Sequence, residues 1–181
     1  MKHIKTFDQL NEGIGSSLSA AFTSDLDKDY KLQIKTIEDI SKSILSSSDL
    51  KNLLSSVQKE NPDVKQLKKY IDLASKSQKL ISKVKSNGLS NRRSEAKKQI
   101  KALTEFAESL KDGFKLIKNF KTKAEKGLKS NEGIGNVVGN TLRNVLTGKW
   151  IVNILKSVKS NLVDSENEFK SVQDVFDIND Y

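Results

Sequence analysis

Hydrophobic residues recur every three or four positions along most of the chain, and this spacing predicts helices. A first stripe covers residues 30–45, and Ser46–Asp49 interrupts it before a short second stripe at 50–57. Pro62 is the only proline and suits the first turn of a helix, which then runs to Asn87-Gly88. A further stripe covers residues 90–110, and residues 114–127 continue with the same spacing. No segment shows the strict alternation of apolar and polar residues that is typical of a β-strand.

The chain is therefore expected to be all-α, an elongated helical bundle or helical hairpins joined by short Ser/Asn/Gly loops. Glycine and polar residues predict three further breaks, at Asn11–Gly15, Thr23–Asp29 and Asp112-Gly113. The physical reason is that glycine costs a helix about 1 kcal/mol relative to alanine, while Ser and Asp favour helix starts.

The segment 134–163 is the most apolar part of the chain, with lysine and arginine beside its apolar positions. Its face includes Val138, Leu142, Val145, Trp150 and Ile154. A basic amphipathic helix with tryptophan can lie on an anionic membrane. The interpretation we favour is the central packing helix of the bundle, for which Trp150→Ala would cost about 3–5 kcal/mol.

Charge is unevenly distributed. The net charge is +9, but the tail 164–181 carries six acidic residues against Lys170, a net of −5, which leaves +14 for residues 1–163. A basic body of this kind indicates a polyanion partner, and non-specific DNA is the one we expect. The candidate phosphate contacts are Arg92, Arg93, Lys97, Lys98 and Lys101. Two alternatives stay open: the lysines only keep the helices soluble, or the tail masks the basic surface until assembly.

Catalytic chemistry is not expected. The chain has no cysteine, and its single histidine, His3, stands near the N-terminus without a nucleophile or base beside it. No phosphate-binding loop, dinucleotide motif or zinc-ligand pattern occurs. We therefore predict a non-enzymatic protein with no cofactor, no metal and no small-molecule substrate.

The first fifteen residues form a separate amphipathic leader. Ile4, Phe7 and Leu10 share one helical face, and the glycine-rich sequence after Leu10 predicts a flexible, protease-accessible joint. Together with the Met-Lys start, Leu10-Asn11-Glu12-Gly13 resembles the targeting and cleavage segment of internal head proteins from T-even-type contractile-tailed phages. The likeness covers about twelve of the 181 residues, and the leader is two residues longer than the usual form, with His3 and Lys5 adding charge.

This resemblance implies that residues 1–12 direct the chain into the assembling prohead and that the prohead protease cuts the Glu12–Gly13 bond. The protein would then lie inside the capsid of the virion, after a period in the host cytoplasm during assembly. The chain divides accordingly into a propeptide (1–12), a basic helical body (13–163) and an acidic tail (164–181).

The sequence Asn-Glu-Gly-Ile-Gly occurs again at 131–135. Ser130 stands where the protease motif requires Leu or Ile, so a capped helix start is favoured over a second processing site. Two rival functions remain open at this point: a membrane-active or host-interacting effector that uses residues 134–163, and a prohead core or scaffolding protein that binds other helices.

Overall fold

The computed structural model describes the backbone of residues 7–47, 54, 64–129 and 149–178, and the side chains of these residues from Asp25 onward except 127–129. The described residues form four α-helices and no strand: α1 (Phe7–Leu45), α3 (Lys65–Asn87), α4 (Arg93–Lys129) and α6 (Lys149–Val175). The all-α prediction is confirmed.

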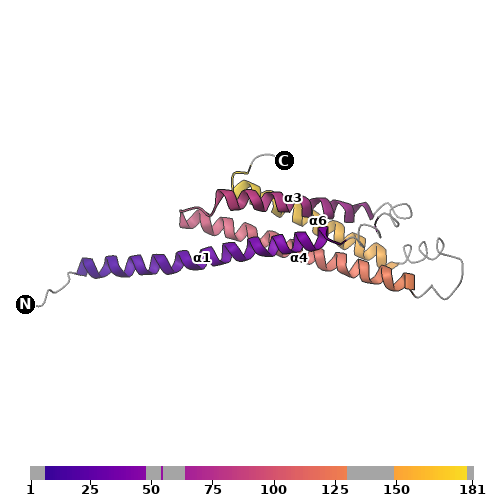
Figure 1. Ribbon diagram of the computed structural model, residues 1–181, viewed down its shortest axis with the longest axis horizontal. Helices are drawn as coiled ribbons and strands as arrows, with labels where there is room; N and C mark the ends of the chain where they lie inside the picture. The colour runs from indigo at the N-terminus through magenta and orange to yellow at the C-terminus, as the bar shows by residue number, and fades with distance from the viewer. Residues whose placement is uncertain (1–6, 48–53, 55–63, 130–148, 179–181) are drawn as a thin grey trace, which may run out of the picture.

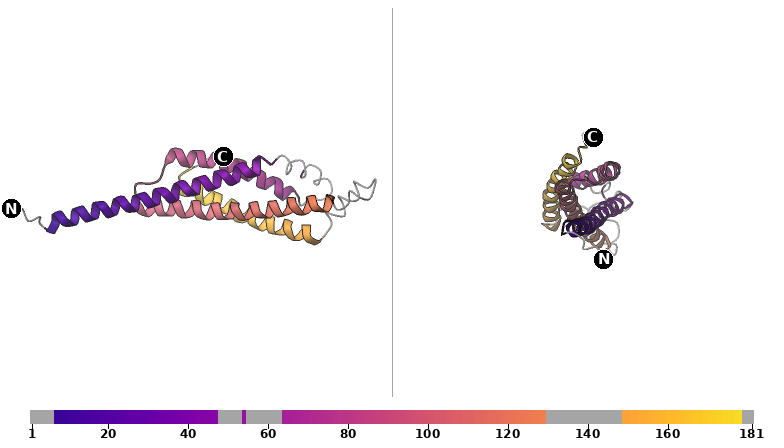
Figure 2. Two further views of the ribbon diagram at one scale, coloured as in Figure 1. Left: turned by 60° about the horizontal axis from the view of Figure 1, so that its bottom comes forward. Right: turned by 90° about the vertical axis from the view of Figure 1, so that its left-hand side faces the viewer.

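The four helices form an elongated bundle in which successive helices run in opposite directions (Figure 1). The main contacts join α1 to α3 and α4, and α6 to α3 and α4. Each helix therefore has two principal neighbours, and the end-on view shows the four helices grouped around a common interior (Figure 2). The N-terminal part of α1 extends beyond the other three helices (Figure 1).

Buried residues alternate at spacings of three and four along each helix, which is the heptad pattern of coiled-coil packing. In α1 they are Tyr30, Ile34, Ile37, Ser41 and Ile44; in α4 they include Ala96, Gln99, Leu103, Phe106, Leu110, Ile117, Phe120 and Ala124; in α6 they include Ile151, Leu155, Val158, Leu162, Ser165, Phe169 and Val172. One buried stripe per helix is enough to form the core, because each stripe packs against two neighbouring helices. The modest hydrophobic content of 35% therefore still yields a continuous core.

Local polar contacts set the helix ends. Gly88 ends α3 with φ +71°, a conformation that glycine adopts without strain, and its N–H donates to the Val84 carbonyl at 3.0 Å. Before α4, the Ser90 hydroxyl accepts the Arg92 N–H at 3.2 Å and donates to Glu95 at 2.8 Å. The predicted boundary at Asn87-Gly88 and the helix start after Ser90 are therefore confirmed. The end of the first stripe at Leu45 is confirmed as well.

The three glycine and polar breaks are wrong. Helix α1 continues through Asn11–Gly15 and Thr23–Asp29, so the joint after the leader is helical backbone. Helix α4 continues through Asp112-Gly113. A single glycine costs only about 1 kcal/mol, and at Gly113 the packing of α4 against its neighbours outweighs that cost.

The prediction that the segment 134–163 packs in the core is confirmed for its described part, residues 149–163, where Ile151, Leu155 and Val158 are buried. The central position is not found: α6 packs mainly on α4 and also on α3, as one of four helices around a shared core. It continues past residue 163 to Val175, so most of the acidic tail is the second half of a core helix. Ile154 is buried, but Trp150 is only half-buried beside Phe120, at a ring-centroid distance of 6.4 Å. Val138, Leu142 and Val145 lie outside the described residues.

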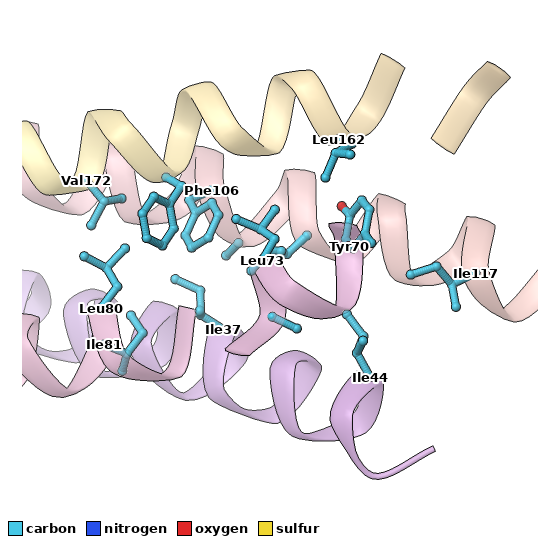
Figure 3. Close-up of a cluster of buried hydrophobic side chains, with 14 of the residues drawn as sticks. Ile37, Ile44, Tyr70, Leu73, Leu80, Ile81, Phe106, Ile117, Leu162 and Val172 are labelled. Carbon is cyan, nitrogen blue, oxygen red and sulfur yellow. The ribbon is translucent and has the colours of Figure 1, made fainter. Parts of the chain in front are cut away.

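Two neighbouring layers of the core have different chemistry; Figure 3 labels Phe106 of the first layer and Tyr70 of the second. In the aromatic layer, Phe106 of α4 meets Phe169 of α6 edge-to-face, with ring centroids 5.7 Å apart. In the polar layer, the Tyr70 hydroxyl of α3 lies 2.6 Å from Asn161 Oδ1 and 2.9 Å from Ser165 Oγ, both on α6.

The polar layer also depends on α4. Ser109 and Ser165 share a hydrogen bond of 2.5 Å between their hydroxyls, and the Asn161 amide donates to the Ser109 carbonyl at 3.2 Å. Gly113 leaves the space that the tyrosine fills, because a Cβ there would lie 1.8 Å from the Tyr70 hydroxyl oxygen. The polar layer thus joins α3, α4 and α6 at one height in the bundle.

Candidate nucleic-acid interface

Lysines are concentrated at one end of the bundle. We define the cationic end as residues 64–76 of the α3 region, 109–126 of α4 and 149–163 of α6. These three stretches hold thirteen lysines and three acidic residues, a net charge of +10. The lysines are Lys65, Lys68, Lys69, Lys76, Lys111, Lys115, Lys118, Lys121, Lys123, Lys126, Lys149, Lys156 and Lys159.

The bundle core dictates where these lysines lie. Heptad positions of α4 face the interior, so the positions between them face water, and Lys111, Lys115, Lys118, Lys123 and Lys126 are all exposed. Two of the α4 lysines at this end have carboxylate partners one turn away: Lys115 with Asp112 at 2.8 Å, and Lys121 with Glu125 at 3.7 Å. Such surface pairs contribute little to stability.

Lys123 lies over the Trp150 ring, 6.0 Å from its centroid, and Lys118 lies 5.8 Å from the Phe114 centroid. These cation–π contacts hold ammonium groups close to the bundle surface without neutralising their charge. Two of the positive charges at the cationic end are therefore held near an aromatic ring on the bundle surface.

The opposite end has the reverse balance. We define the mixed end as residues 7–29 of α1, 77–108 and 164–178. It carries ten basic and thirteen acidic residues, a net charge of −3. Glu168 illustrates the local field: its pKa is raised by burial first and then by the neighbouring carboxylates of Glu105 and Asp164. The tyrosine of the polar layer lies near the boundary between the two ends.

The five cations predicted as phosphate contacts all lie at the mixed end. Arg92 pairs with Glu95 at 3.2 Å, and Lys101 pairs with Glu105 at 3.6 Å. The Glu95 carboxyl has a lowered pKa because it accepts hydrogen bonds from Ser90 and Arg92. Arg93 also has an interaction partner. Lys97 and Lys98 are exposed, with Lys98 at the rim of a cleft.

Sequence reasoning missed the lysines of residues 111–126. The signal was present, because this half of α4 has six lysines and two acidic residues, whereas residues 93–108 have four basic residues against three acidic ones. Counting charges by half-helix would have found it. The grouping with α3 and α6 lysines, however, required the direction of each helix.

The cleft at the mixed end has a volume of about 570 Å³ and lies between the α3–α4 turn and the end of α6. Side-chain hydrogen bonds close its floor: Gln99 accepts the Ser90 N–H at 2.9 Å and donates to the Val175 carbonyl at 3.2 Å, and Asn87 donates to the Phe176 carbonyl at 2.9 Å. These bonds satisfy the last carbonyls of α6, which indicates a structural role.

Within the described part of the chain, no group of three or more His, Cys, Asp or Glu residues is arranged to hold a metal ion. None of the described helices is long and apolar enough to cross a bilayer. The leader is only partly described: Ile4 lies outside the described residues, and for Phe7, Leu10, Asn11, Glu12 and Gly13 the structure gives helical backbone.

Comparison of the chain with family models, with curated proteins and with solved structures found no match.

Proposed function

We propose that this chain is a non-enzymatic phage virion protein, packaged inside the head, whose cationic end associates with packaged DNA without sequence preference. The observation that carries the DNA part is the separation of charge: +10 at the cationic end, against −3 at the mixed end of the full chain and −1 once residues 1–12, with Asp8 and Glu12, are removed. Clustered lysines neutralise phosphates and release the counterions condensed on DNA, which is the driving force of non-specific binding. The likeness of the leader to phage head-targeting segments supports the virion part.

The proposed processing by the prohead protease requires the first turns of α1 to unwind, because the Glu12–Gly13 bond lies in helical backbone. Three features favour unwinding. Gly13 and Gly15 each weaken the helix by about 1 kcal/mol, the bond is six residues from the start of α1, and this part of the helix extends beyond the rest of the bundle (Figure 1).

The membrane-active alternative receives less support from the described residues. Ile151, Ile154, Leu155 and Val158 are buried in the bundle, so this part of the segment has no free apolar face. Val152 and Val163 are exposed singly, which is ordinary for a protein surface.

DNA binding is tested by fluorescence anisotropy with a labelled duplex of arbitrary sequence over a range of salt concentrations. The variant Lys111→Gln/Lys115→Gln/Lys118→Gln removes charge from the cationic end, and Lys97→Gln/Lys98→Gln/Lys101→Gln is the matched control at the mixed end. We expect the first variant to reduce the slope of log affinity against log salt by about 0.9 for each lost phosphate contact. The control should change it little. If both variants reduce the slope equally, residues 97–101 contact DNA as well and the interface is not confined to the cationic end. A wild-type protein whose binding does not depend on salt would refute the DNA role.

The leader is tested separately, by determining the N-terminal residue of the protein recovered from its native particle. Processing predicts Gly13, and Glu12→Gln should leave the leader attached. Recovery of chains that begin at Met1 would contradict the targeting role without affecting the DNA experiment.

A further inference from the structure

The turn between α3 and α4 contains a dipeptide with chemistry of its own. Asn87 is the only asparagine in the chain that is followed by glycine. In an Asn-Gly pair the backbone nitrogen of the glycine can attack the amide carbon of the asparagine, because glycine has no Cβ to hinder the approach. We propose that Asn87 is a site of spontaneous deamidation, that the end of α6 controls its rate, and that the product holds this end of the bundle open. The inference is independent of the DNA role.

The reaction needs only water. The Gly88 nitrogen loses its proton and forms a bond to Cγ of Asn87, the Cγ–Nδ2 bond breaks, and the amide nitrogen leaves as ammonia. Water then opens the cyclic imide at either of its carbonyls and gives aspartate or isoaspartate. An amide and a water molecule become a carboxylate and an ammonium ion, so the balance requires no oxidant, reductant or cofactor.

Two hydrogen bonds keep the reacting groups apart in the folded chain. The Gly88 N–H donates to the Val84 carbonyl at 3.0 Å, which holds the nucleophile in the last turn of α3. The Asn87 amide donates to the Phe176 carbonyl at 2.9 Å, which directs the electrophile toward α6. Both bonds must break before the imide can form, so the reaction waits for the ends of α3 and α6 to separate.

Water and space are available once that separation occurs. Asn87 is exposed and borders both the cleft of about 570 Å³ and a second hollow of about 200 Å³ beside Ile178. No neighbouring atom lies within 4 Å of the position that a Cβ would take at Gly88. Ring closure therefore meets no steric barrier from the rest of the fold.

The pair Asp112-Gly113 is better protected. Aspartate before glycine forms the same imide, by loss of water, but this pair lies within the continuous helix α4. Closing the ring there would require α4 to unwind on both sides of the pair and the Tyr70 hydroxyl to leave the space beside Gly113. Asn87, the last residue of its helix, requires only the end of α3 to part from the end of α6.

The product cannot restore the contact that it replaces. A carboxylate at position 87 has no proton to donate, so it faces the Phe176 carbonyl as a second acceptor. The Asp177 carboxylate borders the same hollow, and a negative charge at the C-terminal end of α3 also opposes the helix dipole. Lys83 borders the hollow as well and offsets part of the new charge, but the two acceptors remain opposed. Conversion therefore separates the ends of α3 and α6 irreversibly.

Mass spectrometry of the full chain tests the site and its control by α6. The protein is incubated at neutral pH and digested with trypsin, which cuts after Lys85 and Arg92 and isolates residues 86–92. This peptide also contains Asn91, which arginine follows, as an internal reference. We expect conversion at Asn87 alone, at a rate about tenfold or more below that of the free peptide 86–92, because it depends on a local opening of the fold.

The variant Ile178→Ala removes a buried side chain from the end of α6 and should accelerate conversion several-fold. Val163→Ala, an exposed change on the same helix, is the matched control and should leave the rate unchanged. Circular dichroism checks that both variants are folded. A native chain that converts as fast as the free peptide overturns the control by α6, and so does a folded Ile178→Ala variant that converts at the wild-type rate.

The consequence of conversion is tested with two variants at the same position. Asn87→Asp has the product carboxylate, whereas Asn87→Ala loses the hydrogen bond without gaining charge. Hydrogen exchange is measured at the amides of Phe176 and Ile178, which are hydrogen-bonded within the end of α6. We expect exchange to be several-fold faster in Asn87→Asp than in Asn87→Ala. Equal exchange in the two variants would show that the carboxylate does not hold this end of the bundle open.

Discussion

The aromatic layer and the polar layer are neighbours in the same core, yet they are held by different interactions. In the aromatic layer, Phe106 and Phe169 are buried against each other, and any large apolar pair would recover most of that free energy. In the polar layer, Tyr70 satisfies its hydroxyl only if α3, α4 and α6 align at one height. The comparison indicates that the first layer supplies stability and the second supplies register.

The largest expected effect is in the aromatic layer. Phe106→Ala removes a fully buried ring and leaves a cavity, so the free energy of unfolding should fall by about 3–5 kcal/mol. Urea or thermal denaturation measures this. Lys98→Ala, an exposed change on the same helix, is the control and should stay within about 0.5 kcal/mol of wild type. If Phe106→Ala lowers the free energy of unfolding by less than about 1 kcal/mol, the neighbouring side chains have repacked to fill the cavity.

The polar layer should be sensitive to alkali. Burial raises the pKa of Tyr70 to about 12; the Ser165 hydrogen bond opposes this, and the charges of Asp112 and Asp164 add to it. The unfolded tyrosine ionises near pH 10, so the folded protein should lose stability between about pH 10 and 12, by about 2–3 kcal/mol at 1.36 kcal/mol per unit.

Denaturation is measured at a series of pH values for wild type and for Tyr70→Phe. The difference in stability between the two proteins isolates the effect of Tyr70, because the titration of the lysines contributes equally to both. Below pH 10 the difference should be constant. If both proteins lose the same stability between pH 10 and 12, Tyr70 is not buried as described.

Gly113→Ala tests the space that the polar layer needs. The new Cβ would lie 1.8 Å from the Tyr70 hydroxyl oxygen, so the ring must move and its hydrogen bonds weaken. We expect a loss of about 1–3 kcal/mol, although alanine favours the helix by about 1 kcal/mol. In a Tyr70→Leu background the loss should shrink, because the hydroxyl and ring carbon nearest the new Cβ are gone, while Asn161 Oδ1 remains 2.5 Å from it. A double-mutant cycle measures the coupling, and additive effects would refute it.

Trp150 should give the smallest change among the aromatic residues compared. Its ring is half-buried at the cationic end, 6.4 Å from Phe120, so Trp150→Ala should cost about 1–2 kcal/mol. A fully buried tryptophan would cost about 3–5 kcal/mol. Thermal denaturation of Trp150→Ala and Phe106→Ala, measured side by side, ranks the two losses of stability. Equal losses would support the sequence-based prediction that Trp150 is a core residue.

The pattern of apolar residues predicted the fold class and several helix ends, because one buried stripe per helix leaves a clear period in the sequence. It failed where glycine was taken for a break. Gly113 lies inside a helix because the Tyr70 ring, 43 positions earlier in the chain, occupies the space beside it. Gly88, with φ +71° and no tertiary neighbour near its Cβ position, does end a helix.

The candidate interface was predictable only in part. Net charge indicated a polyanion partner. Of the cations chosen around Arg92, Arg92 pairs with Glu95 and Lys101 pairs with Glu105, whereas Lys97 and Lys98 are exposed. The lysines at 111–126 gain their significance from those of α3 and α6 at the same end of the bundle. That proximity depends on the antiparallel order of the helices, which a charge count along the sequence does not contain.

Among the residues whose side chains the structure describes, the polar bonds between helices are distributed unequally, and we expect this to produce an order of opening. Side chains of α3, α4 and α6 are joined by the Tyr70 hydroxyl, by Gln99 to the Val175 carbonyl and by Asn87 to the Phe176 carbonyl. The bonds described for α1 are Tyr30 to the Val84 carbonyl and the Lys85–Glu38 pair, both to α3. Helix α1 should therefore detach as a cooperative unit, and its amide protons should exchange with solvent at a lower free energy than those of the other three helices.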